Sequence, residues 1–336
     1  MRTSDFDFEL PPELVASHPA ERRDEARLLV VDRTSGELGD SVVRDLPRWL
    51  ARGDLLVLND TKVLFGRLFA RRTTGGKVEI LLLRREPGGT CRALVKAHRH
   101  LRPGEVVELE EDIRAELIER DASDGIWRVR FHGDLDAALP RIGHVPLPPY
   151  LKRDDTPGDR ERYQTVFARD EGSAAAPTAG LHFTKELFAS LAEAGIANTK
   201  VTLHVGYGTF KPIKVDHIAD HRVDGEQYEV TAAAAASIQE NRGRLVTVGT
   251  TSTRVLETLA RTGGIRAEAG STDLFLYPGE PFLAVDALMT NFHLPMSSLF
   301  LLVCAFAGRE AMLAAYEHAI ANRYRFYSYG DAMLIL

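Results

Sequence analysis

The sequence is poor in cysteine and contains no long hydrophobic run. Its two cysteines, Cys91 and Cys304, cannot build a disulfide framework or a four-thiolate metal site, and they suit a reducing compartment. The longest apolar run, from Leu299 to Ala307, is far shorter than the roughly 20 residues of a membrane span. The first residues lack the basic region and apolar stretch of a secretion signal. These absences predict a cytoplasmic protein with no membrane partner.

Motifs of several enzyme classes are also missing. No Gly-x-Ser-x-Gly and no Walker sequence occurs, which argues against an α/β-hydrolase and a P-loop protein. His217 and His221 have the i,i+4 spacing of some metal ligands. However, no glutamate follows the first histidine as in zinc proteases, and no cysteine pair is nearby. We therefore expect no metal.

The net charge of −6 hides a basic segment. From Thr61 to Gly104 the chain has eleven Lys and Arg against two Glu, a local charge of +9 that leaves −15 for the other residues. A basic segment on an acidic body is typical of a region that contacts a phosphate backbone. A solvated arginine-rich face is the alternative interpretation.

Short alternating segments predict a small antiparallel barrel in the same region. The length of 336 residues predicts two domains, and the apolar fraction of 44% is enough for their cores. Strands are expected early, at 26–32 and 54–60, with a short helix at 46–52. Between Lys62 and Val145, Gly- and Pro-containing turns separate alternating runs. These expected barrel strands are 77–83, 91–96, 105–109, 114–119 and 126–131.

After Tyr150 the pattern changes to alternating helices and strands. Thr184 is expected to cap a helix that ends before Gly195, and Ser252 or Thr253 to open another. Further helices are expected from Thr231 and over 312–323, and strands over 201–205, 245–249 and 332–336. Alternation of this kind predicts a layered α/β domain. The predicted fold is thus a discontinuous α/β catalytic domain, 1–60 and 149–336, with an inserted small antiparallel β-barrel, 61–148.

Four polar loops of the α/β domain are candidates for a common pocket. A strand ends at Gly249 and leads into Thr250-Thr251-Ser252-Thr253-Arg254, a small hydroxyl-rich helix start of the kind that binds anions and nucleotides. The other loops each carry a histidine beside glycine or amide groups. They are 174–183 with His182, 204–210 with His204, Gly206, Gly208 and Phe210, and 291–295 with Asn291 and His293.

At these segments the chain closely resembles the S-adenosylmethionine:tRNA ribosyltransferase-isomerases of queuosine biosynthesis. The likeness extends from the first residues to the last and includes uncommon strings such as Pro177-Thr-Ala-Gly-Leu-His-Phe183. The matching stretches are 58–63, 76–84, 93–96, 146–150, 163–168, 176–183, 201–210, 248–252, 290–295 and 324–333. The resemblance implies an α/β domain with an inserted β-barrel, in agreement with the pattern above.

The resemblance also implies a reaction. Members of the family transfer and isomerise the ribose of S-adenosylmethionine onto 7-aminomethyl-7-deazaguanine at the tRNA wobble position, giving epoxyqueuosine, adenine and methionine. S-adenosylmethionine is then a ribosyl donor, and tRNA the macromolecular partner. A base must remove the acidic proton beside the sulfonium, and imidazoles suit that task. The candidate bases are His182, His204 and His293.

Binding roles follow for further residues. The predicted donor-binding residues are Gly206, Gly208, Phe210, Gly249, Thr250, Thr251, Ser252, Arg254 and Asn291. Carboxylate and amide groups for the acceptor base are available at Asn59, Asp60 and Asn291, and rings for stacking at Tyr150, Phe210 and Phe292. The predicted tRNA contacts are Lys62, Arg67, Lys96, Arg99, Tyr150 and Arg153.

The chain departs from the family pattern at three places. Asp224 replaces a histidine, Met296 stands where a lysine is common, and Ala97-His98 replaces a proline-containing basic string. Two alternatives therefore stay open: a diverged relative that uses another acceptor, and an RNA-binding protein that keeps the fold without turnover. The sequence does not indicate an oligomeric state.

Overall fold

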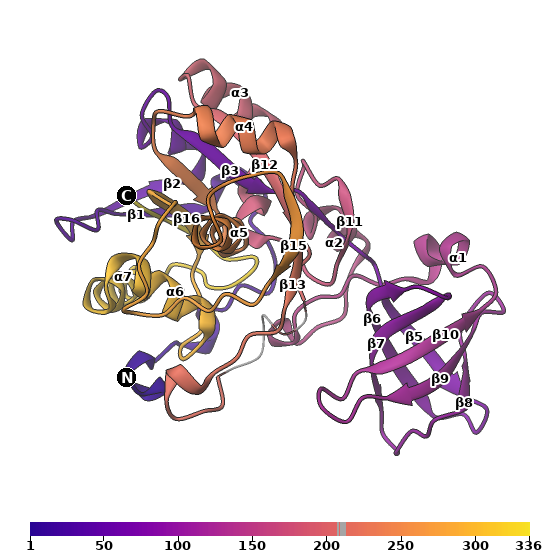
Figure 1. Cartoon of the computed structure of the whole chain (residues 1–336). Helices are drawn as coiled ribbons and strands as arrows, with labels where there is room; N and C mark the ends of the chain where they lie inside the picture. Colours follow the sequence, from indigo (N-terminus) through magenta and orange to yellow (C-terminus); the bar gives the residue numbers. More distant parts are fainter. Residues whose placement is uncertain (207, 209–212) are drawn as a thin grey trace.

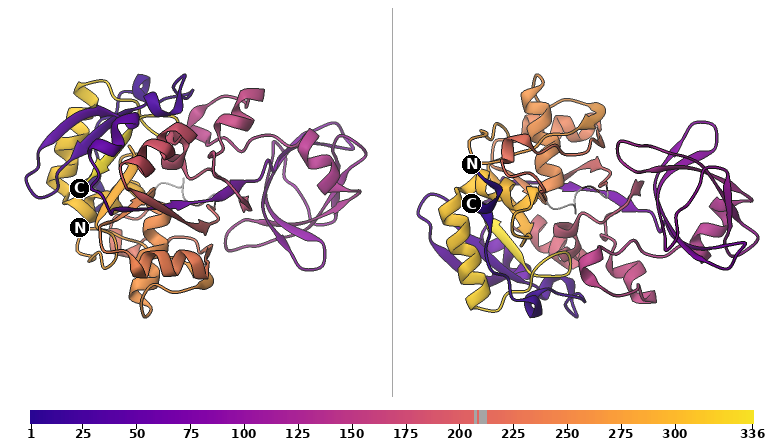
Figure 2. Two further views of the ribbon diagram at one scale, coloured as in Figure 1. Left: turned by 90° about the horizontal axis from the view of Figure 1, so that it is seen from above. Right: turned by 90° about the horizontal axis from the view of Figure 1, so that it is seen from below.

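The molecule consists of an α/β body and a β-barrel that stands to one side of it. The computed structural model describes residues 1–206, 208 and 213–336. In Figure 1 the barrel lies at the right, and the two views of Figure 2 show the same separation from above and below. Both chain termini belong to the body. The predicted fold class, a layered α/β domain with an inserted antiparallel barrel, is confirmed.

A nine-stranded mixed sheet forms the centre of the body. Its middle strands are parallel: β3 lies between β12 and β14, and β14 pairs with β16. Strand β17 is antiparallel to β16 and parallel to β1. The order is β15 (Glu268–Thr272), β13 (Glu226–Val230), β12 (Ala197–Leu203), β3 (Leu55–Asn59), β14 (Leu245–Val248), β16 (Ala287–Asn291), β17 (Ala332–Ile335), β1 (Arg27–Val31) and β2 (Leu38–Val42).

Both faces of this sheet are covered, because its central strands alternate between two apolar cores. Leu55 and Val57 of β3 face a core with helices α4 to α7, whereas Leu56 and Leu58 face a core with α3 and the 3₁₀ segment Val43–Arg48. Strands buried on both sides read as continuous apolar runs. The helices are α2 (Pro157–Arg162), α3 (Lys185–Glu193), α4 (Ala232–Glu240), α5 (Thr250–Arg261), α6 (Ser298–Ala307) and α7 (Arg309–Ala321).

Local capping chemistry sets most of the helix starts. The hydroxyls of Thr184 and Thr231 accept the N–H groups of the third residues of α3 and α4, as N-caps do. Helix α5 differs from the prediction, because it begins at Thr250 rather than at Ser252 or Thr253. Its N-cap is Gly249, whose φ of 88° lies in a region that glycine adopts most easily.

Six antiparallel strands close the barrel around a separate core. The order around it is β10-β7-β6-β5-β8-β9, and inward residues such as Leu68, Ile80 and Val129 are fully buried. The sequence prediction missed β5 and the helix α1, which packs on this core. The elements are β5 (Arg67–Arg72), β6 (Lys77–Glu86), β7 (Thr90–Ala97), β8 (Glu105–Glu108), β9 (Arg114–Arg120), β10 (Trp127–His132) and α1 (Leu135–Ile142).

A short two-stranded sheet joins the two parts. Strand β4 (Thr61–Val63) follows β3 at once and runs toward the barrel, and it pairs in parallel with β11 (Asp170–Ser173) on the returning chain. In Figure 1 β11 lies between the sheet and the barrel. This junction places polar residues that follow β3, β11 and β12 next to the barrel.

Within the described residues, no single helix has the length and apolarity to cross a membrane. Helices α6 and α7 meet those criteria only as a pair, and the chain bends by 115° between them.

Candidate active site

A cavity of about 210 Å³ lies at the carboxyl edge of the sheet, and we call it the sheet-edge cavity. Residues after β14 and β16, the loop 176–179 and the chain near Tyr327 line it. Sheets with parallel central strands bind ligands at this edge. All four loops singled out in the sequence reach this cavity, the loop 204–210 through Val205.

Two buried polar atoms of this cavity have no hydrogen-bond partner within the described part of the chain. They are the hydroxyl oxygen of Thr251 and the amide oxygen of Asn291. The orientation of the Asn291 amide is fixed, because its nitrogen donates to the carbonyl oxygens of Tyr327 at 3.0 Å and Asp331 at 3.4 Å. Leaving such atoms unpaired in a folded protein is costly. A ligand that hydrogen-bonds to both would relieve this cost.

Aromatic rings line the same cavity. Tyr150, predicted to contact nucleic acid, lies here, with its ring centroid 4.6 Å from that of Tyr327. Its hydroxyl is hydrogen-bonded to that of Ser328. Burial raises the pKa of Tyr150, and it raises that of Tyr327 to about 12, so both hydroxyls are neutral at physiological pH. With the buried ring of Phe292, these residues give the cavity an apolar wall.

Of the predicted helix-start residues, three line this cavity and two do not. Gly249, Thr250 and Thr251 line it. The hydroxyl of Ser252 instead donates to the carbonyl of Val248, 3.1 Å away within the body. The guanidinium of Arg254 is buried among β13 and the chain after β15, where all three of its nitrogens are hydrogen-bonded.

The three candidate histidines occupy three different environments. His293 lines the sheet-edge cavity, its Nε2 3.0 Å from the hydroxyl of Thr290. His182 lies behind Asn291, with its Nε2 3.2 Å from the amide nitrogen. Burial lowers the pKa of His293 to about 3 and that of His182 to about 4. Both are therefore neutral and weakly basic at pH 7.

His204 lines a second, larger cavity of about 570 Å³ between the body and the barrel, the interdomain cavity. Val205 lines both cavities, so they adjoin at the end of β12. The imidazole Nδ1 of His204 is 2.8 Å from the hydroxyl oxygen of Thr61. Burial lowers its pKa below the usual 6.5, although the carboxylates of Asp170 and Asp60 act in the opposite direction.

The body side of the interdomain cavity includes the segment 223–227 and two predicted donor-binding glycines, Gly206 and Gly208. Glu226 accepts the N–H of Gly206 at 2.7 Å and is ion-paired with Arg254. Asp224 also lines the cavity. A Cβ atom on Gly208 would lie 2.3 Å from a carboxylate oxygen of Asp224, so a larger residue there would displace that carboxylate. Phe210 lies outside the described residues.

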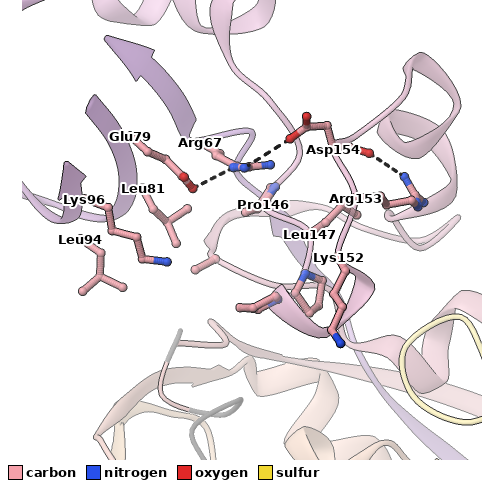
Figure 3. A pocket seen from close by; sticks show the side chains of 13 residues that line it. Arg67, Glu79, Leu81, Leu94, Lys96, Pro146, Leu147, Lys152, Arg153 and Asp154 are labelled. Carbon is pink, nitrogen blue, oxygen red and sulfur yellow. Dashed lines mark hydrogen bonds and ion pairs between the residues drawn. The ribbon is translucent and has the colours of Figure 1, made fainter. Parts of the chain in front are cut away.

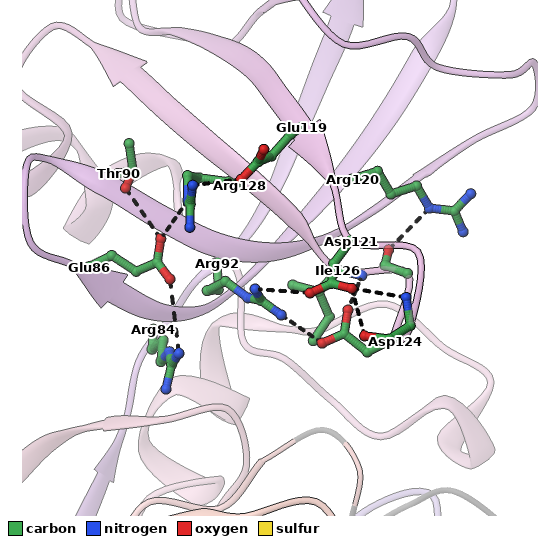
Figure 4. Close-up of polar contacts among 12 residues, drawn as sticks. Arg84, Glu86, Thr90, Arg92, Glu119, Arg120, Asp121, Asp124, Ile126 and Arg128 are labelled. Carbon is green, nitrogen blue, oxygen red and sulfur yellow. Dashed lines mark hydrogen bonds and ion pairs between the residues drawn. The ribbon is translucent and has the colours of Figure 1, made fainter.

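Arginines from the barrel form the opposite wall. Arg84, Arg85 and Arg92, which were not among the predicted contacts, line the interdomain cavity. Each is paired with an acid from the barrel or α1: Arg84 with Glu86, Arg85 with Asp136, and Arg92 with Asp121 and Asp124. Figure 4 shows the pairs of Arg84 and Arg92, together with Arg128 between Glu86 and Glu119.

These pairs change the interpretation of the basic segment. Its excess of cations precedes a stretch from Glu105 to Asp136 that has eleven Asp and Glu but only four Arg. The closed barrel brings the two stretches together, and Arg72, for example, lies 2.5 Å from Glu105. Much of the predicted positive charge is therefore balanced within the barrel itself.

A third hollow of about 360 Å³, the proline groove, lies between β5 to β7 and the segment 146–154. Lys96 lines it from the barrel, and Lys152, which sequence reasoning missed, lines it from the body. Figure 3 shows these two residues on opposite sides of the groove. Arg67 lies between Glu79 at 2.9 Å and Asp154 at 3.6 Å.

The other predicted nucleic-acid contacts differ in whether their side chains are already engaged in ion pairs within the protein. Both terminal guanidinium nitrogens of Arg153 donate to Asp159, at 2.7 and 2.8 Å, so this side chain anchors the segment before α2. Lys62 is 3.2 Å from Glu171 beside the junction of the two parts. Arg99 is exposed in the loop after β7 and has no ion pair with any residue that the structure describes.

Asn59 and Asp60, proposed as readers of the acceptor base, are buried beside the junction instead. The amide of Asn59 pairs with both backbone groups of Leu203, at 2.9 and 3.0 Å. Asp60 accepts the hydroxyl of Thr202 at 2.7 Å, and burial raises its pKa. Both residues support the end of β12, from which His204 extends.

The described ranges contain no group of three or more His, Cys, Asp and Glu side chains that could hold a metal ion. His217 and His221 flank the short 3₁₀ segment Ile218–Asp220, so the helical face that their spacing suggested does not form.

Comparisons with known proteins agree over the full chain. The family model for queuosine biosynthesis proteins matches residues 3–335. A curated relative from Citrifermentans bemidjiense, named S-adenosylmethionine:tRNA ribosyltransferase-isomerase, is 50% identical over 100% of both chains. A relative of the same name from Anaeromyxobacter sp. is 52% identical over 100% of this chain and 99% of its own. The crystal structure of S-adenosylmethionine tRNA ribosyltransferase from Thermotoga maritima is 36% identical, with a TM-score of 0.57 over 99% of this chain and 100% of that one.

Proposed function

The chain belongs to the family of queuosine biosynthesis proteins, and we propose that its adjoining cavities divide the reaction of an S-adenosylmethionine:tRNA ribosyltransferase-isomerase between them. The sheet-edge cavity holds S-adenosylmethionine, and the interdomain cavity receives the acceptor base of tRNA. The observation that supports this proposal is that Val205 lines both cavities, so the two cavities are adjacent. A ribosyl group bound on one side of Val205 is near an acceptor bound on the other.

The unpaired atoms of Thr251 and Asn291 support the donor assignment. The amino, hydroxyl and adenine N–H groups of S-adenosylmethionine can donate to the amide oxygen of Asn291. Its carboxylate can accept a hydrogen bond from the hydroxyl of Thr251. The N–H groups at the start of α5 suit the carboxylate, because a helix N-terminus attracts negative charge. The rings of Tyr150, Phe292 and Tyr327 offer an apolar wall for the adenine.

His204 is the proposed general base. The sulfonium of the donor makes the hydrogens on the neighbouring ribose carbon acidic. In this step that C–H bond breaks, its electron pair stays on carbon, and the proton forms an N–H bond with Nε2 of His204. His293 and His182 suit the step less well, because their pKa values of about 3 and 4 make them weak bases.

The acceptor side is the 7-aminomethyl-7-deazaguanine of the tRNA wobble position. Its amine forms the new bond to the ribosyl group, and adenine and methionine leave. The bases of an anticodon loop are unpaired, so one of them can turn into the interdomain cavity at small cost. Lys96 and Lys152 in the proline groove, and the exposed Arg99, are suitable for the flanking phosphates.

The test is turnover with a defined tRNA. The purified chain is incubated with S-adenosylmethionine and tRNA that carries 7-aminomethyl-7-deazaguanine, and adenine release and tRNA mass are measured. Adenine release with modified tRNA is expected. Release only with a different acceptor would identify a diverged enzyme, which the position of Asp224 in the interdomain cavity makes worth testing. Binding of RNA without release would identify an RNA-binding protein.

Histidine variants test the assignment of the base. His204→Gln is expected to reduce turnover at least about a hundredfold, within the range that general bases contribute. His318→Gln, on α7 and hydrogen-bonded to Asp40, is the matched control and should retain turnover. Turnover of His204→Gln within about twofold of the unsubstituted enzyme would overturn the assignment.

A further inference from the structure

Three separate chain segments hold the imidazole of His204 in place. The ring contacts Thr61 on β4 and Gly172 on β11, while Asn59 at the end of β3 holds the strand from which His204 extends. We propose that Thr61 and Gly172 are positioning residues that fix the tautomer and the orientation of His204. The proposal rests on the proposed function, in which His204 is the base.

Thr61 selects the tautomer because its single hydroxyl proton has another acceptor. The hydroxyl donates to the carbonyl oxygen of Asp170, 3.5 Å away, and a carbonyl can only accept. With its proton directed to this carbonyl, the hydroxyl presents a lone pair to Nδ1 of His204, 2.8 Å away. In this arrangement, which is the one we assign, Nδ1 of His204 carries the hydrogen. In a neutral imidazole the other nitrogen is then unprotonated. Nε2 makes no hydrogen bond to the described residues, and the ring lines the interdomain cavity.

Gly172 allows the observed orientation of the ring, because without a side chain its backbone can lie directly against the imidazole. A Cβ atom at this position would lie 2.9 Å from Cε1 and 3.1 Å from each ring nitrogen of His204. These distances are shorter than van der Waals contact, so any larger residue would push the ring away. The backbone of β11 at Gly172 thus leaves room for the imidazole in its observed orientation.

Asn59 fixes the position of the strand end. Its amide nitrogen donates to the carbonyl of Leu203, and its amide oxygen accepts the N–H groups of Leu203 and Thr61, at 3.0 and 3.1 Å. One buried side chain therefore sets the spacing between Thr61 and the residue that precedes His204.

The charged groups around His204 favour the protonated form that the reaction would create. Asp60 faces it from the end of β3, Asp170 from β11 and Glu229 from β13, and all three raise its pKa against the lowering effect of burial. Asp60 and Asp170 are linked through the hydroxyl of Thr202, at 2.7 and 3.3 Å. The imidazole is thus neutral before proton transfer, and these carboxylates stabilise the imidazolium that forms after it.

The tautomer is tested directly by nitrogen-15 NMR of the histidine-labelled full chain without substrates. The His204 ring should show a protonated Nδ1 and an unprotonated Nε2 near pH 7.5. In Thr61→Val, which has the same shape without the hydroxyl, the population should shift toward the Nε2-protonated tautomer. Thr61→Ser, which keeps the hydroxyl, should resemble the unsubstituted chain. A protonated Nε2 in the unsubstituted chain would overturn the proposal, and this measurement requires no variant to fold.

Turnover provides the second readout. Thr61→Val and Gly172→Ala should each lower kcat at least about tenfold, while KM for S-adenosylmethionine stays within about twofold, because neither residue lines the sheet-edge cavity. Thr61→Ser should restore most of kcat. Unchanged kcat in both Thr61→Val and Gly172→Ala would overturn the positioning role. Failure of the proposed function would be seen in a different experiment. If His204→Gln retained turnover, His204 would not be the base, whichever tautomer the NMR spectrum shows.

Discussion

Arg254 on α5 is ion-paired with Glu226 on β13, and the second carboxylate oxygen of Glu226 accepts the N–H of Gly206. Helix α5 begins at the sheet-edge cavity, whereas Gly206 lines the interdomain cavity. A single buried carboxylate therefore ties together the chain segments that form the two cavities.

The first prediction concerns this carboxylate. Glu226→Gln keeps an oxygen for the Gly206 N–H but leaves the buried guanidinium of Arg254 without a counter-charge. The free energy of unfolding should fall by about 3 kcal/mol, which is typical when one member of a buried ion pair is removed. Urea denaturation measures the change. Glu229→Gln, on the exposed side of the same strand, is the control and should change stability by less than about 0.5 kcal/mol. Equal effects of the two variants would contradict the structural role of the pair.

The second prediction separates two neighbouring hydroxyls of α5. Thr251→Val removes a buried hydroxyl that has no partner among the described residues, so folding stability should not decrease. Affinity for S-adenosylmethionine should fall about fivefold, the equivalent of one hydrogen bond. Ser252→Ala should leave affinity unchanged, because that hydroxyl donates to Val248. Calorimetric titration with S-adenosylmethionine measures the affinities of both variants. If Ser252→Ala lost more affinity than Thr251→Val, S-adenosylmethionine would not bind at Thr251 in the sheet-edge cavity.

The third prediction is a pH dependence of stability. Burial lowers the pKa of His182 to about 4 and that of His293 to about 3, whereas both should titrate near 6.5 in the unfolded chain. Below pH 6.5 the unfolded chain therefore binds more protons, so the stability that these histidines contribute is complete above that pH and is lost as the pH falls. Each should contribute a loss of about 2 kcal/mol between pH 6.5 and 5.

Denaturation at a series of pH values measures this effect. His293→Gln should show a smaller loss of stability between pH 6.5 and 5 than the unsubstituted chain, whatever its stability at pH 7.5. A free energy of unfolding that stays constant across this range would show that the two imidazoles are not buried in neutral form.

The fourth prediction concerns the proline groove. Lys96→Gln should weaken tRNA binding and reduce the slope of log affinity against log salt by about 1, because one phosphate contact releases about one counterion. Lys185→Gln, exposed on α3 of the body, removes the same charge away from the barrel and should leave the slope unchanged. Identical slopes for Lys96→Gln and the unsubstituted chain would exclude this lysine from the interface.

Local sequence patterns were sufficient for much of the fold. The cap at Thr184, the helix start near Thr231 and the alternating barrel strands are short-range features, and the structure has them where they were predicted. Strand β5 was missed because Arg67–Arg72 is rich in arginine, and only its pairing with β6 and β8 reveals it as a strand. Helix α5 begins earlier than predicted because Gly249, not a hydroxyl residue, is its N-cap.

The sequence alone therefore determined the order of the elements, the inserted barrel and the polar loops at the sheet edge, since these depend on residues close together in the chain. The tertiary structure decided which polar groups are available. It paired Arg254 with Glu226, turned Arg153 toward Asp159, and placed Thr61 against His204. The ion pairs between the barrel arginines and the acidic residues form only in the closed barrel, because their partners come from different segments of the chain. A side chain's protonation and its freedom to bind depend on neighbours that folding brings from distant segments, and no local pattern encodes them.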